Sequence, residues 1–211
     1  MSHSHGGHMG HGPEPVTYSR AIARPKPVFE SKCTKVGPVT FPAFTGERIY
    51  MMPFLNGREH PGLERWQKTI AAMLKGIPVG VLCYLMVDQS TVEPGQPQRR
   101  PGVHVDGNWT AESGWTIGGG LWKELQDVGY LPESIVLASN IEGCVGYTGV
   151  FEGRPGPGGN CSHIDISGGQ KVALKPNLAY RGNVTFLHES TPILKGGKRT
   201  LVRINVPGIE P

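Results

Sequence analysis

Residues 99–109 read RRPGVHVDGNW, and they set a histidine and a carboxylate two positions apart in an apolar, alternating run. Side chains of a β-strand point to the same face at every second residue. We therefore expect His104 and Asp106 to share one face of a strand, while Val103 and Val105 point to the other. One imidazole beside one carboxylate is two thirds of a 2-His-1-carboxylate iron site.

The His-x-Asp spacing is weak when taken alone. Eight histidines and 17 acidic residues in 211 positions give roughly 0.6 such pairs by chance. The chain indeed holds a second pair, His163 and Asp165. The C-terminal part of the chain supports a functional role for the first pair. There, His188 ends an apolar run and Arg199 begins the next run, 11 residues later.

This order of residues resembles that of the Fe(II)- and 2-oxoglutarate-dependent oxygenases, which show His-x-Asp, a long insertion, a distal histidine and an arginine on the following strand. The resemblance covers roughly residues 79–206. It implies that His104, Asp106 and His188 ligate Fe(II), and that Arg199 pairs with the far carboxylate of the co-substrate 2-oxoglutarate.

The second His-x-Asp pair fits this pattern less well. His163 precedes His188 by only 25 residues, whereas His104 precedes it by 84. The shorter separation leaves little room for the strands and loops that the family places between its ligands. We therefore interpret His163 and Asp165 as structural residues.

Arginine suits the co-substrate position because its planar guanidinium can hold a carboxylate through two parallel hydrogen bonds. Arg203, 15 residues after His188, is a position that some family members use instead of Arg199. On one strand the two arginines would share a face about 13 Å apart, at ~3.3 Å per residue. The arginine that does not bind the co-substrate is left for an anionic substrate group or a structural acid. Tyr147 could also donate to a bound carboxylate, or be satisfied by a backbone carbonyl.

Composition predicts one mainly β domain. A chain of 211 residues can bury one sizeable core, and 31 glycines with 19 prolines favour turns and short strands. Residues 79–87 form an apolar run of strand length, and residues 61–75 carry apolar side chains at helical spacing. We expect a double-stranded β-helix, or jelly roll, with one or two flanking helices.

The domain is expected to span residues 39–211, preceded by a flexible arm over residues 1–38. Residues 1–12 read MSHSHGGHMGHG, a composition typical of a purification tag or an incidental tail, and a proline-rich stretch follows. Whether this arm clasps another subunit in a homo-oligomer or trails in solvent stays open. A second short helix is expected over residues 121–128, where a glycine and a proline follow.

No apolar run approaches the roughly 18 residues of a membrane span, and the four cysteines lack metal or disulfide spacing. We therefore expect a cytoplasmic protein with free thiols and no membrane partner. The net charge is +4, and residues 171–203 hold seven basic residues against one acid, Glu189. This basic face suits an anionic substrate, and nucleic acid is not excluded, although a solvated strand edge would look the same.

The function expected from the resemblance is hydroxylation of an unidentified substrate, with 2-oxoglutarate and O2 converted to succinate and CO2. A non-catalytic jelly-roll protein, such as a virion component, is the alternative, because the long arm and the glycine-rich sheet also suit assembly. A cupin-like metalloenzyme without a keto acid is a third hypothesis, in which Arg199 would be dispensable.

Overall fold

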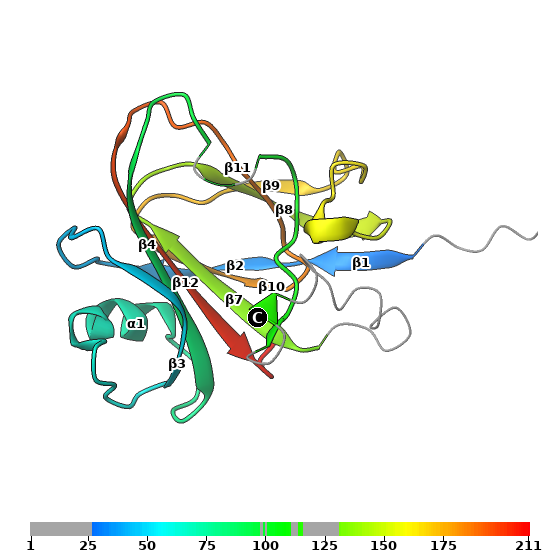
Figure 1. The fold of residues 1–211 in the computed structure, drawn as a ribbon. Coiled ribbons are helices and arrows are strands. Elements are labelled where there is room, and N and C mark those ends of the chain that lie inside the picture. Colours follow the sequence, from blue (N-terminus) through cyan, green and yellow to red (C-terminus); the bar gives the residue numbers. More distant parts are fainter. Residues whose placement is uncertain (1–26, 98, 100, 111–113, 116–130) are drawn as a thin grey trace, which may run out of the picture.

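A computed structural model describes residues 27–97, 99, 101–110, 114–115 and 131–211. Antiparallel β-sheets dominate these residues, so the prediction of a mainly β protein is confirmed (Figure 1). The two larger sheets lie against each other and do not close into one barrel. The expected second helix, over residues 121–128, lies outside the described part of the chain.

The larger sheet has six strands. Its two longest strands, β12 and β4, are neighbours and are each 11 residues long. In spatial order the strands are β2 (Cys33–Pro38), β10 (Leu178–Asn183), β7 (Glu133–Ser139), β12 (Gly197–Pro207), β4 (Leu82–Val92) and β3 (Arg48–Leu55).

The smaller sheet is built on β8, which pairs with three other strands. Its members are β1 (Val28–Ser31), β8 (Cys144–Glu152), β9 (Gln170–Ala173) and β11 (Leu187–Ser190). His104 extends this sheet, because it forms isolated bridges with His188 of β11 and with Asn160. A separate two-stranded ribbon consists of β5 (Trp109–Thr110) and β6 (Gly114–Trp115).

The outer face of the larger sheet is covered by the helical segment, which is a 3-10 turn (η1, Glu64–Trp66) followed by α1 (Gln67–Met73). This segment lies inside the predicted range 61–75 and presents Trp66 and Met73, both fully buried, to the sheet. Val202 and Ile204 of β12 point into the same core. The alternate residues of β12 therefore point to the inner face, toward the smaller sheet.

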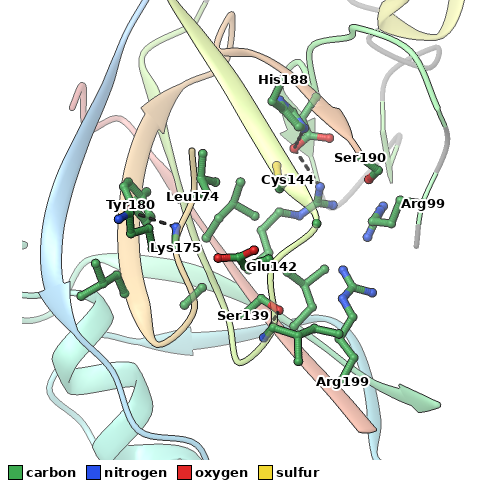
Figure 2. Close-up of a pocket in the computed structure, with 18 of the residues that line it drawn as sticks. Arg99, Ser139, Glu142, Cys144, Leu174, Lys175, Tyr180, His188, Ser190 and Arg199 are labelled. Carbon is green, nitrogen blue, oxygen red and sulfur yellow. Dashed lines mark hydrogen bonds and ion pairs between the residues drawn. The ribbon is translucent and has the colours of Figure 1, made fainter. Parts of the chain in front are cut away.

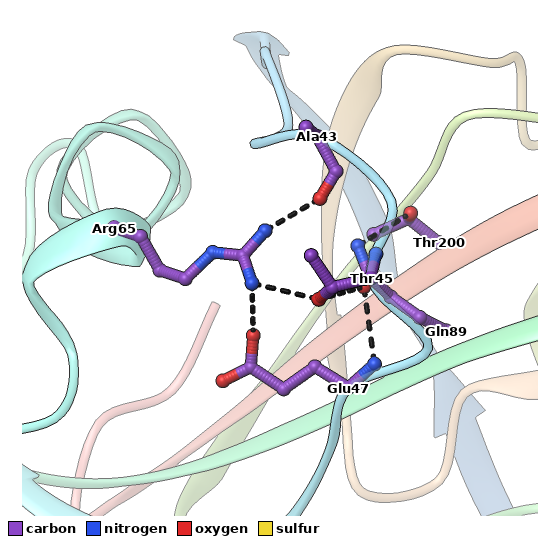
Figure 3. Close-up of polar contacts among 6 residues, drawn as sticks. All are labelled: Ala43, Thr45, Glu47, Arg65, Gln89 and Thr200. Atoms are coloured by element: carbon purple, nitrogen blue, oxygen red, sulfur yellow. Dashed lines mark hydrogen bonds and ion pairs between the residues drawn. The ribbon is translucent and has the colours of Figure 1, made fainter.

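A polar cluster fixes the loop over residues 43–47 to the helical segment and to the sheet (Figure 3). Arg65 donates through Nη1 to Glu47 Oε2 at 2.8 Å. The buried Gln89 of β4 accepts from the backbone N–H groups of Thr45 and Glu47 through Oε1, and its Nε2 donates to Thr200 of β12. These contacts hold the chain segment that leads into β3.

The sheets begin at Val28, so strands β1 and β2 lie within residues 1–38, the range that was expected to form a flexible arm. β1 pairs with β8 and β2 pairs with β10, so residues 28–38 contribute to both sheets. Phe29 and Ser31 of β1 are buried while their neighbours are exposed, an alternation that the surrounding prolines obscured. Residues 1–26 lie outside the described part.

The helices that the structure describes are too short or too polar to cross a membrane. The four cysteines are free thiols, as expected.

Candidate metal centre

His104 and His188 lie directly opposite each other on adjacent, antiparallel segments of the smaller sheet. The backbone N–H of each residue donates to the carbonyl of the other, at 2.9 and 3.0 Å. Residues that exchange both hydrogen bonds in an antiparallel pair stand directly opposite and project their side chains to the same face. The two imidazole centroids are 4.5 Å apart.

Asp106 completes the group, because it is two residues beyond His104 and so returns to the same face. The three side chains each offer one ligand atom, and these atoms lie within 4.8 Å of one another. His188 Nε2 is 3.7 Å from Asp106 Oδ2. The predicted triad is thus brought together, and this mostly buried His-Asp-His group could bind a metal ion.

Backbone carbonyls fix the orientation of both imidazoles. His104 Nδ1 is 2.8 Å from the Gly102 carbonyl, and His188 Nδ1 is 2.9 Å from the Phe186 carbonyl. A carbonyl only accepts, so each Nδ1 carries the proton and Nε2 is the nitrogen suited to ligate a metal. Metal-binding histidines are usually oriented in this way, and the donor set of two imidazoles and a carboxylate fits Fe(II).

The Asp106 carboxylate is held by Arg203, whose Nη1 is 3.0 Å from Oδ2. Burial raises the pKa of Asp106, but the charges of Arg203, His188 and His104 outweigh burial and leave this pKa well below its usual value. Asp106 is therefore an anion at neutral pH, which is the form that a metal requires. Arg203 is thus engaged in an ion pair with the Asp106 carboxylate.

A cavity of about 70 Å³ opens beside the triad, and this is several times the volume that one water molecule needs. Arg199, Leu201 and Arg203 all line it, so the two arginines share the inner face of β12 as predicted. Apolar side chains form much of the remaining wall (Figure 2); they include Leu137, Ile141, Leu174 and Leu178.

Arg199 is a buried cation with little compensation. It is 6 % exposed, and its Nη1 has no hydrogen-bond partner among the described residues. Its ion pair with Asp88 is long, at 3.9 Å. Burial lowers the pKa of Arg199 to about 10, with Asp88 opposing the shift and Arg99 adding to it. Arg199 is therefore charged at neutral pH and suited to bind an anion from the cavity.

Tyr147 does not join the other predicted site residues. It pairs with Leu187 in the β8–β11 ladder, one position from the pair of Gly146 with His188, so it lies on the opposite face. Its hydroxyl donates to Glu189 at 2.5 Å, and this hydrogen bond raises the pKa of Tyr147 to about 12. Its partner is thus a side-chain carboxylate, neither the bound ligand nor the backbone carbonyl that the sequence suggested.

The second His-x-Asp pair lies at the surface. His163 is exposed, with Nε2 2.8 Å from the Arg154 carbonyl, and Asp165 is exposed and accepts from the Ser167 N–H. Only Ile164, between them, is buried. This pair has the structural role expected from its position in the chain.

The segment that carries Asp106 is supported by a buried carboxyl that sequence reasoning missed. Glu133 of β7 accepts from the Asn108 side chain at 2.8 Å and from the Trp109 backbone N–H at 3.3 Å. Asn205 donates to its other oxygen. Burial raises the pKa of Glu133 against these hydrogen bonds. No local pattern in the sequence signals that Asn108 contacts a residue 25 positions away.

Comparison of the chain with protein-family models, with curated proteins and with solved structures finds no match in any of the three.

Gly146 is expected to be required for the position of His188. A Cβ at Gly146 would overlap the ring of Phe186. This ring stacks on the imidazole of His188, with 5.6 Å between the ring centroids and 19° between the ring planes. We expect Gly146→Ala to destabilise the fold by about 1–3 kcal/mol, as overpacking usually does, and to weaken metal binding. Chemical denaturation and a metal titration measure the two effects. Gly168→Ala is the control, because an added Cβ there meets no atom within 4 Å; equal behaviour of both variants would contradict the prediction.

Proposed function

We propose that the chain is an Fe(II)- and 2-oxoglutarate-dependent dioxygenase. In the overall reaction 2-oxoglutarate, O2 and a substrate C–H group yield succinate, CO2 and the hydroxylated substrate. The observation that carries the proposal is the combination of a His-Asp-His group with a buried, poorly compensated arginine in one cavity.

The protein's side chains divide the work. His104, Asp106 and His188 would hold Fe(II) from one side and leave its other positions to the keto acid and O2. Bound iron supplies the activation of O2 and the polarisation of the keto acid. Arg199 would receive the far carboxylate of 2-oxoglutarate, since its guanidinium faces the cavity and lacks a good partner. Arg203 orients the Asp106 carboxylate.

The path of the chain supports a jelly-roll interpretation of the two sheets. From β4 of the larger sheet the chain passes to His104 beside the smaller sheet, returns to β7, and crosses to β8 and β9. It then runs through β10, β11 and β12, which belong to the larger, smaller and larger sheet in turn. Such alternation between facing sheets is typical of the double-stranded β-helix.

The assembly alternative loses part of its motivation. It rested on a long arm free to clasp neighbouring subunits, yet residues 28–38 pair with strands of their own chain. Nor does an assembly role require a buried guanidinium such as Arg199 to face a cavity next to three potential metal ligands.

The direct test is anaerobic addition of Fe(II) and 2-oxoglutarate. We expect the weak visible absorption of a keto acid chelated to iron, and release of succinate when O2 and candidate substrates are then supplied. Zn(II) in place of Fe(II) is the control and gives no such absorption. If folded protein binds Fe(II) but the absorption is absent, 2-oxoglutarate is not its co-substrate, and the cupin-like alternative is left.

A further inference from the structure

A third arginine faces the same cavity as the metal triad. Arg99 belongs to the loop between β4 and His104, and its side chain is exposed at the cavity rim (Figure 2). Its Nη1 reaches the Met86 sulfur at 4.0 Å. Met86 is paired with Arg203 in the β4–β12 ladder, so the Arg99 guanidinium lies over the inner face near the metal triad.

The chain just before Arg99 is anchored at residues 95–97. Gly95 donates to the Ile193 carbonyl at 2.7 Å, and Pro97 bridges to Pro192. A Cβ at Gly196 would come within 2.6 Å of the Val92 carbonyl oxygen, so the two chain segments are in close contact. Residues 95–97 are therefore held beside the segment that joins β11 to β12.

Charges around the cavity are not balanced by the proposed ligands. Four basic residues line it, of which Arg99 and Lys175 are exposed, and two acids oppose them, Asp106 and Glu142. A divalent metal would add two positive charges and 2-oxoglutarate would remove two. Among the lining residues an excess of two positive charges remains after both have bound. Counting Asp88, which pairs with Arg199 from outside the lining, still leaves an excess of one, which favours a further anion.

Arg99 has no ion pair with the carboxylates of the described residues, and its charge acts on its neighbours. Burial lowers the pKa of Arg199 and of Arg203, and the charge of Arg99 lowers both further. Arg203 is engaged with Asp106, and Arg199 is assigned to the co-substrate. Arg99 is the exposed guanidinium at the rim that neither role uses.

We propose that Arg99 binds a carboxylate or phosphate group of the substrate, so that the enzyme acts on an anionic substrate. This inference rests on the proposed function, because it takes Arg199 to be occupied by 2-oxoglutarate. Arginine suits the task, since its fork matches both carboxylate and phosphate oxygens. An anion held by Arg99 would lie in the cavity that the metal triad also lines, because the guanidinium contacts Met86 on the inner face of the sheet.

The test uses full-length protein loaded anaerobically with Fe(II) and 2-oxoglutarate, with inorganic phosphate and acetate as probes. Calorimetry measures anion binding, while the keto acid absorption reports that the co-substrate stays bound. We expect saturable binding of at least one probe to the wild type, about tenfold or more weaker in Arg99→Gln, with the absorption unchanged. Arg58→Gln, an exposed arginine in the hollow beside α1, should bind the probe as the wild type does.

The possible results separate the two proposals. Equal probe affinity in Arg99→Gln and wild type, or no saturable binding while the absorption is present, would overturn the role of Arg99 alone. Weaker binding of 2-oxoglutarate by Arg99→Gln would also overturn the role of Arg99, because Arg99 would then belong to the co-substrate site. Failure of the wild type to develop the absorption would refute the proposed function, and this inference with it.

Discussion

Replacement of His188 by alanine is expected to lower the affinity of the protein for divalent metal by about 100-fold or more, which exceeds the usual cost of losing a single supporting contact around a metal. The variant keeps the backbone hydrogen bonds with His104, because these involve only N–H and carbonyl groups. It loses one of three ligands and leaves only His104 and Asp106 to bind the ion. Competition with a chelating dye, using Mn(II) or Co(II), measures the change.

His163→Ala is the matched control for this prediction. His163 heads the other His-x-Asp pair, lies at the surface and is not part of the His-Asp-His group. Its removal should leave metal affinity within a factor of two of the wild type. Thermal unfolding with and without metal gives a second readout, since binding to the folded state raises its stability. Equal affinities of the two variants would show that His188 is not a ligand.

The local part of this centre could be predicted from sequence. A period of two along a strand places His104 with Asp106, and Arg199 with Arg203, whatever the rest of the fold does. These pairs share their faces in the structure. What alternation cannot supply is the partner strand and its register. The bridge between His104 and His188 joins residues 84 positions apart, and a slip of one residue would turn His188 to the other face.

The same limit explains the two site residues that sequence reasoning placed less well. Tyr147 lies one register position from Gly146, the partner of His188, and this single step puts its hydroxyl across the sheet from the metal triad. Arg203 was the reserve for the co-substrate, but its position in the β12–β4 ladder brings it to Asp106. Both outcomes depend on contacts between distant strands, which a strand's own sequence does not encode.

Arg199 is expected to lower the stability of the protein when no metal or keto acid is bound. Arg199→Met should therefore yield a more stable protein that no longer binds 2-oxoglutarate. The guanidinium is 6 % exposed, its Nη1 lacks a hydrogen bond among the described residues, and Asp88 is 3.9 Å away. Removing one partner of a buried ion pair is usually destabilising, but here the pair is long and Asp88 stays partly exposed to water and paired with Arg48. Relief of the desolvation cost of the guanidinium is therefore expected to dominate, by about 1–3 kcal/mol. Chemical denaturation of metal-free protein, without keto acid, measures this gain.

The same substitution should lower the affinity for 2-oxoglutarate by about 100-fold or more, because the far carboxylate would then enter the cavity without a buried cation to pair with. Calorimetry at neutral pH measures the loss, where Arg199 of the wild type is fully charged, its pKa being about 10. Arg48→Met is the control, since the exposed Arg48 contacts the same Asp88 at 3.8 Å from outside. Arg48→Met should change neither stability nor co-substrate affinity appreciably. If Arg199→Met destabilised the fold and left 2-oxoglutarate affinity intact, Arg199 would be a structural partner of Asp88, and the co-substrate would have to bind elsewhere.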